Sequence, residues 1–182
     1  ESWYHIQASK IHPNAKSILD VGAGSLSHLK YESNYTNYEI VEPKKYLLKF
    51  CKNKLFKISN CYKNLKQIPK DKSYDKILSI MVLEHVKDLD NHLKLISEKL
   101  NNKGKFVIEM SAQDDFLYWL SWRLTTGFIF WLKYKLDYGI LMSYERINSY
   151  ENILKIIRKY FFIKEKKSFP LNIKNLRIYV HL

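Results

Sequence analysis

The sequence predicts an α/β domain with a mostly parallel sheet, and three observations support this. Short apolar runs alternate with stretches of helical spacing from Ser17 onward, which is typical of βαβ units. The run Lys76–Leu83 is almost continuously apolar, as expected of a central strand covered on both faces. The chain has 182 residues, of which 46% are hydrophobic, so it can bury a sizeable core as one domain spanning residues 1–182.

The first half of the chain contains three candidate strands. Ser17–Val21 is a short apolar run that leads into Gly22 and Gly24, and a helix is expected after this glycine turn. Tyr38–Val41 is the second run, and Leu55–Ser59 is a weaker third. Each run is followed by a polar turn and then by helix-like spacing.

The central run is followed by a helix and a fifth strand. The apolar residues of this helix are spaced four, three and four positions apart: Leu89, Leu93, Ile96 and Leu100. The helix should stop before Asn101–Gly104, a polar segment that ends in glycine. The fifth strand is expected over Lys105–Met110.

The remaining third of the chain begins with an insertion. Gln113–Asn148 is crowded with aromatic residues and breaks the strand and helix rhythm. A helix should then begin at Ser149, whose hydroxyl can cap it, with an apolar face made of Ile153, Leu154, Ile156 and Ile157. The closing runs Phe161–Lys166 and Leu176–Leu182 have no helix between them, so they should be antiparallel neighbours.

The net charge of +13 raises the question of a polyanionic partner. Only four of the 31 basic residues are arginine, whereas nucleic-acid interfaces favour arginine for its bidentate pairing with phosphate and guanine. The sequence therefore disfavours a nucleic-acid partner. An anionic membrane or a phosphorylated substrate stays open.

Two cysteines, Cys51 and Cys61, fit neither a disulfide framework nor the paired spacing of a metal site. They are expected to be reduced thiols, which favours a cytoplasmic location. The opening residues show no basic start followed by an apolar run, so no signal peptide is expected from them. No metal site is predicted, because His5 and His12, like His85 and His92, are seven residues apart, with no cysteine partner at ligand spacing.

The glycine turn after the first strand is the strongest chemical signal. Gly22 and Gly24 permit the close approach of a ligand to the backbone. A nicotinamide dinucleotide site needs a third glycine where Ser27 stands, so that cofactor is disfavoured. Glu42 ends the second strand about twenty residues later, where a carboxylate can accept both hydroxyls of a ribose. A plain tight turn and a merely solvated glutamate are the alternatives.

Several segments together resemble the class I S-adenosylmethionine-dependent methyltransferases. Asp20–Ser25 is similar to the first motif of that family, and Val41–Pro43 is similar to the second. Ser73–Ile77, followed by Met81–Val86, resembles the motif at the fourth strand. Leu100–Val107 resembles the turn into the fifth strand. The likeness is greatest to the branch that includes ubiquinone and menaquinone biosynthesis enzymes and many small-molecule and sugar methyltransferases.

The resemblance implies a Rossmann-like sheet of seven strands in the order 3-2-1-4-5-7-6, with the last strand antiparallel. It implies S-adenosylmethionine as cofactor, S-adenosylhomocysteine as product, and methyl transfer to a small molecule or to a glycan or lipid-linked precursor. The implied cofactor-binding residues are Asp20, Gly22, Ala23, Gly24, Glu42, Pro43, Asn60, Cys61, Ile80 and Met81. Within this set, the glycine turn would hold the methionine and ribose part, and Asn60 and Cys61 would contact adenine.

Two residues depart from the pattern of the family. Leu26 stands where a further glycine is usual, and Asn60 replaces a common acidic residue. These departures leave open a methyltransferase-like protein that binds the cofactor or a partner without turnover. An RNA or DNA methyltransferase is a weaker alternative, because Glu84–Val86 stands where base-modifying relatives carry their acceptor motif.

His85 is the candidate catalytic residue, because it follows the fourth strand and could act as a general base. The alternative is that it only caps or packs near the cofactor. The aromatic insertion, residues 113–148, has three interpretations: a lid packed on the core, a pocket for the methyl acceptor, or a surface that rests peripherally on a membrane. A spanning helix is not expected, because Arg123, Lys133 and Lys135 interrupt the apolar stretch.

Overall fold

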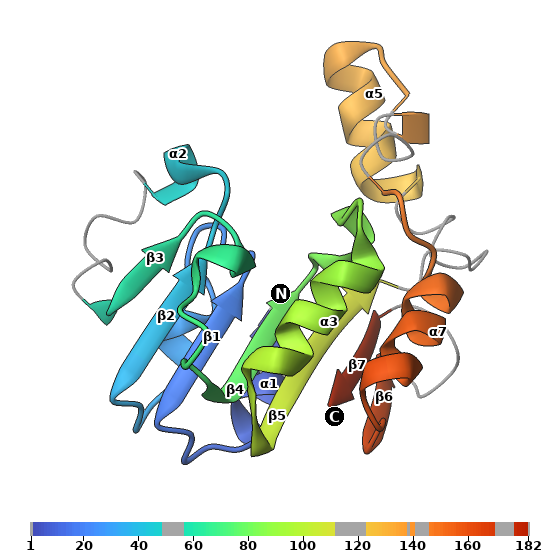
Figure 1. Cartoon of the computed structure of the whole chain (residues 1–182). Coiled ribbons are helices and arrows are strands. Elements are labelled where there is room, and N and C mark those ends of the chain that lie inside the picture. The colour runs from blue at the N-terminus through green and yellow to red at the C-terminus, as the bar shows by residue number, and fades with distance from the viewer. Residues whose placement is uncertain are drawn as a thin grey trace.

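A sheet of seven strands runs through the computed structural model, in the order β3-β2-β1-β4-β5-β7-β6 (Figure 1). The structure describes residues 2–48, 57–111, 123–137, 139–140, 146–169 and 177–181. The strands are β1 (Ser17–Val21), β2 (Asn37–Val41), β3 (Asn60–Tyr62), β4 (Tyr74–Ile80), β5 (Leu100–Ser111), β6 (Glu165–Phe169) and β7 (Arg177–His181). The first five are parallel, and β7 pairs antiparallel with both β5 and β6. The predicted α/β class with a parallel core is confirmed, as is the antiparallel pairing of the two closing strands.

Helices cover both faces of the sheet (Figure 1). The longer ones are α1 (Ser2–Lys10), α3 (Leu89–Lys99) and α7 (Tyr150–Tyr160), and the shorter ones are α2 (Lys45–Leu48) and α5 (Phe128–Tyr134). Single turns are η1 (Leu29–Tyr31), η3 (Leu65–Gln67), η4 (Leu83–His85) and η5 (Arg123–Gly127). One apolar cluster joins α3 and α7 to one face of the sheet, and a second joins α1 and η1 to the other.

Helices α3 and α7 form where the sequence predicts them, because both carry an apolar stripe and a capping side chain. Leu89, Leu93 and Ile96 of α3 are buried, and the Asp88 carboxylate accepts a hydrogen bond from the amide of Asn91 at 3.3 Å. The Ser149 hydroxyl accepts one from the amide of Asn152, also at 3.3 Å, at the start of α7. Each cap satisfies an amide that the first turn leaves without a partner.

The helix expected after the glycine turn does not form. The connection from β1 to β2, which the structure describes throughout, contains only the turn η1. Leu26 has a φ of +57°, a left-handed value that stops a helix from propagating. The segment is also rich in Gly, Ser and Asn, which favour turns over helix interiors. The prediction of a helix at this point is therefore wrong.

Several predicted strand boundaries also differ from the structure. The first of the two closing strands, expected over Phe161–Lys166, lies at Glu165–Phe169. The third strand was expected over Leu55–Ser59 but lies at Asn60–Tyr62. Of the expected range, the structure describes Lys57–Ser59, which precede the strand. Strand β4 ends at Ile80 rather than at Leu83, because Met81 adopts a φ of +57° and turns the chain into η4. Strand β5 begins at Leu100, with a register irregularity opposite β4 where a polar turn was predicted.

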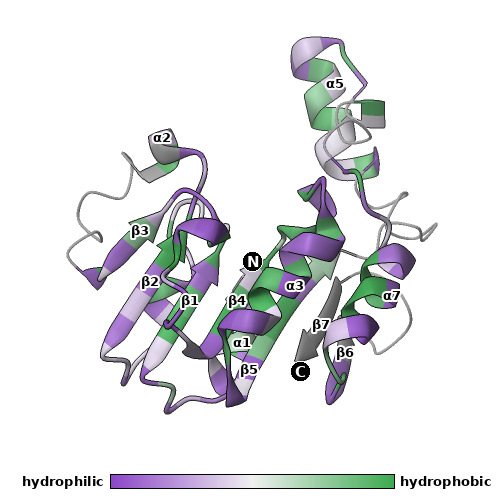
Figure 2. Cartoon of the chain, viewed as in Figure 1, coloured by the Kyte–Doolittle hydropathy of each residue, from purple (hydrophilic) through white to green (hydrophobic). Residues whose placement is uncertain are grey.

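The aromatic insertion is described in part. Its helical segment, η5 followed by α5, stands apart from the rest of the molecule, on the side to which the arrowheads of β2 and β5 point (Figure 1). Much of α5 is coloured as hydrophobic in Figure 2. Within the described ranges, no helix is long and apolar enough to cross a bilayer.

Candidate functional site

The glycine turn lies at the carboxyl end of β1, packed against the start of the segment that follows β4. Gly22 has a φ of +75°, and a Cβ atom there would overlap Cγ2 of Val82. Gly24 has a φ of +51°, and an added Cβ would approach only the carbonyl oxygen of Gly22, at 3.9 Å. Gly22 is therefore required for packing, whereas Gly24 leaves open space beside the backbone.

Glu42 is fixed against this turn by backbone hydrogen bonds. One carboxylate oxygen, Oε2, accepts from the amide of Gly24 at 2.8 Å, and Oε1 accepts from the amide of Lys44 at 2.8 Å. The side chain is buried, with 4% of its surface exposed. Each carboxylate oxygen can accept two hydrogen bonds, so each retains one acceptor position for a ligand. The two amides orient the carboxylate before any ligand arrives.

A cavity of about 640 Å³ opens beside Glu42. Its volume lies within the range of roughly 300–1,000 Å³ that is usual for small-molecule sites. Six residues singled out from the sequence line it: Gly22, Gly24, Glu42, Pro43, Met81 and His85. The first four residues lie in the turns that follow β1 and β2, and the last two follow β4, so the cavity lies across the carboxyl ends of three neighbouring strands. Ligands bind at this edge of an open α/β sheet.

A second cavity, of about 270 Å³, lies on the other side of the glycine turn. Asp20, Ala23 and Ile80 line it, together with Gly22, Gly24 and Met81, which also line the larger cavity. All but two of the residues predicted to bind the cofactor therefore line one cavity or both. The two cavities meet at the glycine turn.

Asn60 and Cys61 line neither cavity. They lie within β3 rather than after it, and the amide nitrogen of Asn60 donates to Oε1 of Glu39 at 2.9 Å. Lys63 and Asn64 follow the strand and line the larger cavity instead. The sequence could not place them, because β3 is a three-residue edge strand with mostly exposed side chains and no apolar pattern.

Leu26, which stands where a further glycine is usual, does not line either cavity. Its side chain is fully buried in the core cluster that also contains Ala8 and Leu29. The left-handed backbone at this position is the conformation that glycine adopts most easily, which accounts for the glycine usual in similar sequences. Leu26 therefore strains the backbone but leaves the cavity open.

Two histidines, His85 and His92, line the larger cavity. His85 lies in η4 with an exposed side chain, and its amide donates to the carbonyl of Val82 at 2.9 Å. His92, in the first turn of α3, has a pKa lowered to about 4 because burial disfavours its charged form. Its Nε2 is buried and has no hydrogen-bond partner in the described part of the chain. Sequence reasoning missed His92 as a lining residue of this cavity.

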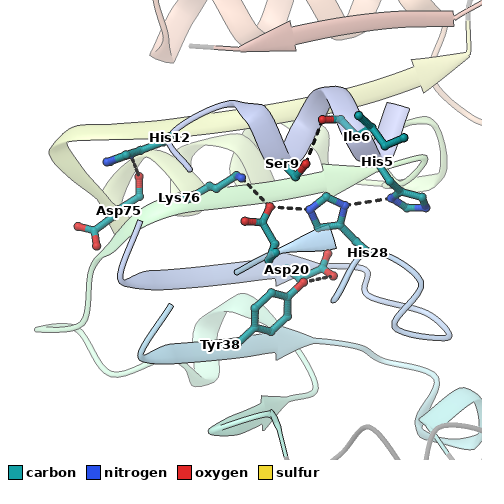
Figure 3. Close-up of polar contacts among 10 residues, drawn as sticks. His5, Ile6, Ser9, His12, Asp20, His28, Tyr38, Asp75 and Lys76 are labelled. Carbon is teal, nitrogen blue, oxygen red and sulfur yellow. Dashed lines mark hydrogen bonds and ion pairs between the residues drawn. The ribbon is translucent and has the colours of Figure 1, made fainter. Parts of the chain in front are cut away.

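A chain of buried polar side chains (Figure 3) includes His5 and His28, which line the smaller cavity. Nδ1 of His5 and Nδ1 of His28 are 3.0 Å apart, and Nε2 of His28 lies 2.7 Å from Oε1 of Glu32. The Nζ of Lys76 donates to the same oxygen at 2.5 Å. Burial, followed by the charge of His28, lowers the pKa of His5 to about 4. These contacts join α1, the β1–β2 connection and β4 behind the site.

Asp20 belongs to the same buried region. It accepts a hydrogen bond from the hydroxyl of Tyr38 at 2.9 Å, and burial raises its pKa (Figure 3). Sequence reasoning found Asp20 through its motif but missed His5 and His28, because their contact joins residues 23 positions apart. Among the residues that the structure describes, no three His, Cys, Asp or Glu side chains are grouped so that they could hold a metal ion.

The end of the aromatic insertion is attached to the turn that carries His85. The amides of Ile147 and Asn148 donate to the carbonyl of Glu84 at 2.8 and 3.1 Å. The side-chain amide of Asn148 donates to the carbonyls of Leu83 at 3.0 Å and Val86 at 2.6 Å. The insertion therefore returns to the sheet at the edge of the larger cavity.

Comparison with solved structures shows the same fold in several methyltransferases. An S-adenosylmethionine-dependent methyltransferase from Clostridium acetobutylicum matches with a TM-score of 0.67 at 13% identity, covering 98% of this chain and 89% of that one. The N-methyltransferase NodS from Bradyrhizobium japonicum matches with a TM-score of 0.65 at 10% identity, covering 97% and 90%. A putative methyltransferase from Haloferax volcanii, in complex with the activator Trm112, matches with a TM-score of 0.69 at 12% identity, covering 99% and 87%.

Comparison with curated protein sequences gives no significant match. A family model described as a methyltransferase domain matches residues 4–157, which is most of the chain and includes both cavities' lining residues. The glycine turn, Glu42 and the turn after β4 all fall within the matched region. The chain therefore belongs to the methyltransferase-domain family of enzymes.

Proposed function

We propose that this protein transfers a methyl group from S-adenosylmethionine to a small molecule or to a glycan or lipid-linked precursor. The observation that carries the proposal is the Glu42 carboxylate, held by the amides of Gly24 and Lys44 on the wall of the larger cavity. A carboxylate with one open acceptor position on each oxygen suits the two hydroxyls of a ribose. The finer assignment, to the branch that includes ubiquinone and menaquinone enzymes, belongs to the same proposal.

The described residues fit this cofactor on both sides of the glycine turn. The larger cavity would take the adenosine, with Glu42 on the ribose and with Lys63 and Asn64 in place of Asn60 and Cys61 beside the base. The smaller cavity would take the methionine end, beside Asp20 and Ala23. When bound, the cofactor supplies a methyl group already activated by its sulfonium, so the protein's task is to orient the reactants and exclude water.

His85 is proposed as the general base that accepts a proton from the methyl acceptor. It lines the larger cavity near the point where the aromatic insertion returns to the sheet. That placement suits an acceptor held between η4 and the insertion. The NodS protein is named an N-methyltransferase, which agrees with an acceptor that loses a proton from nitrogen or oxygen.

The cofactor proposal is tested by calorimetric titration with S-adenosylmethionine and S-adenosylhomocysteine. The wild-type protein should bind both, and Glu42→Gln should weaken binding by about ten- to a hundredfold, since one carboxylate acceptor becomes an amide donor. Glu39→Gln is the matched control, because Glu39 is also a buried, hydrogen-bonded carboxylate of β2 but lines neither cavity. The control should bind both nucleosides as the wild type does.

The outcome that would overturn this proposal is absence of binding by the folded wild-type protein at millimolar nucleoside. An equal loss of affinity in the Glu39 and Glu42 variants would also remove Glu42 from the site. Circular dichroism of each variant separates lost binding from lost folding. Once an acceptor is identified, His85→Ala should lower turnover without changing nucleoside affinity.

A further inference from the structure

The helical segment Arg123–Tyr134, here named the aromatic helix, exposes an unusual amount of apolar surface. Twelve large apolar side chains are exposed among the residues whose side chains the structure describes, and eight of them lie between Leu124 and Ile140. Within the aromatic helix these are Leu124, Phe128, Ile129, Trp131, Leu132 and Tyr134, each at least half exposed. A contiguous apolar patch of this kind marks an interaction site.

The charges of this segment identify the kind of partner. The sequence from Phe116 to Leu136 contains no acidic residue, and its charged residues are Arg123, Lys133 and Lys135. Two of these lie against aromatic rings: the Nζ of Lys135 is 4.6 Å from the centre of the Trp131 ring, and that of Lys133 is 5.1 Å from the centre of the Tyr134 ring. Apolar and aromatic side chains with interspersed cations match the boundary of a bilayer with anionic headgroups.

Other occupants fit this segment less well. A second copy of the chain would bring the same cations together, in a protein whose net charge is already +13. The aromatic helix is also too short to span a bilayer, in agreement with the absence of a spanning helix from the described residues. A helix of this length can lie in the plane of the interface instead.

We propose that the aromatic helix rests in the surface of an anionic phospholipid bilayer. Its position supports this, because it projects from the molecule on the side of the carboxyl ends of the parallel strands (Figure 1). The insertion also returns to the sheet at the hydrogen bonds between Asn148 and η4, beside the larger cavity. A bilayer in contact with the helix therefore lies on the side of the protein where the cavity is. This proposal goes beyond methyl transfer and does not require it.

The test is co-sedimentation of the full chain with vesicles of phosphatidylcholine alone and of phosphatidylcholine mixed with phosphatidylglycerol. The protein should sediment with the anionic vesicles and stay in the supernatant with the neutral ones. The double variant Phe128→Ser with Ile129→Ser should lower affinity for anionic vesicles by about tenfold or more, because two exposed apolar side chains are lost from the interface. Lys133→Gln should lower it by about fivefold, since a basic residue near such a surface contributes roughly 1 kcal/mol.

Phe162→Ser is the matched control, because Phe162 is 86% exposed but lies between α7 and β6, outside the aromatic helix. It should bind vesicles as the wild type does. Absence of binding to anionic vesicles would overturn the proposal, and so would equal binding by the double variant, which would show attraction by net charge alone. A dimer in analytical ultracentrifugation that the double variant abolishes would assign the surface to a second copy instead.

Discussion

The glycine turn and the aromatic helix lie on the same side of the molecule but are built in opposite ways. Around the turn, Leu26 is fully buried and Glu42 nearly so, and backbone amides hold the carboxylate in place. On the aromatic helix, the large apolar side chains are exposed. Folding and nucleoside binding should therefore both depend on the glycine turn, whereas the aromatic helix should affect only contact with a partner.

Gly22→Ala should produce the largest effect and test the first half of the comparison. The left-handed φ and the overlap with Val82 together should cost about 4 kcal/mol in the free energy of unfolding. Urea denaturation measures this loss. Adding Val82→Ala removes both Cγ atoms of Val82, so the new Cβ at residue 22 meets only the Cβ of residue 82, at 3.3 Å. The double variant should therefore be about 2 kcal/mol more stable than the sum of the two single effects predicts. Additive effects would contradict the packing role assigned to Gly22.

Leu26 offers a sharper test, because its side chain and its backbone act in opposite directions. Leu26→Gly removes a buried side chain but relieves the left-handed strain, so the free energy of unfolding should fall by about 3 kcal/mol. Leu26→Ala keeps the backbone strain, so its free energy of unfolding should be about 1 kcal/mol lower than that of the glycine variant. Alanine is usually the more stabilising of the two residues, so this order is reversed. An alanine variant more stable than the glycine variant would show that the backbone at residue 26 is not strained.

The buried histidines predict how stability depends on pH. The pKa values of His5 and His92 in the folded protein are about 4, below the ordinary value of 6.5. Between pH 6.5 and pH 4, these two histidines therefore bind protons in the unfolded chain but not in the folded one. Their contribution to the free energy of unfolding is complete above pH 6.5 and is lost as the pH falls toward 4. At about pH 5, each histidine should have lowered the free energy of unfolding by about 2 kcal/mol relative to neutral pH.

Urea denaturation over this pH range tests the assignment. His5→Gln and His92→Gln should each reduce the slope of unfolding free energy against pH, and the double variant should reduce it further. The range above about pH 5 is the informative one, because carboxylates also titrate below it. Glu39 is an example: burial raises its pKa, but hydrogen bonds from Lys72 and Tyr74 outweigh this effect and lower the pKa to about 2. An unchanged slope in both single variants would mean that these rings are accessible to protons in the folded protein.

The aromatic helix should give the smallest effect on stability. Ile129→Ser should change the free energy of unfolding by less than about 0.5 kcal/mol, because Ile129 is 64% exposed. Thermal unfolding in the absence of lipid measures this. A loss comparable to that of Leu26→Gly would show that the helix packs on the body of the protein, and the contrast between the two regions would disappear.

The parts of the fold that could be predicted are those with local signals. Strand β1 has the predicted bounds, α3 forms on the predicted apolar stripe, and α7 forms with the predicted Ser149 cap, because each depends on residues within a few positions of one another. The parallel core follows from the same short-range patterns. Gly22, Gly24 and Glu42 line the cavities because they lie just after well-marked strands.

The parts that could not be predicted depend on distant partners. Lys76, within an apolar run, is fully buried because it meets Glu32, 44 positions away, across the sheet. The pairing of His5 with His28 likewise joins α1 to a connection that forms no helix. Strand β3 carries no periodic pattern, so the residues after it were misplaced. In each case the deciding interaction is absent from the local sequence.

The left-handed residues at the site also bear on how the molecule opens. Gly22, Gly24, Leu26 and Met81 all have positive φ within the two segments that border the cavities, and the two non-glycine residues store strain that local opening would release. Amide hydrogens in these segments should therefore exchange with deuterium earlier than those of β1 and β4, to which they are attached. A ligand that binds only the closed form slows such exchange in proportion to its occupancy. Deuterium uptake at residues 22–26 and 81–83 thus becomes a direct readout of nucleoside binding that needs no knowledge of the methyl acceptor.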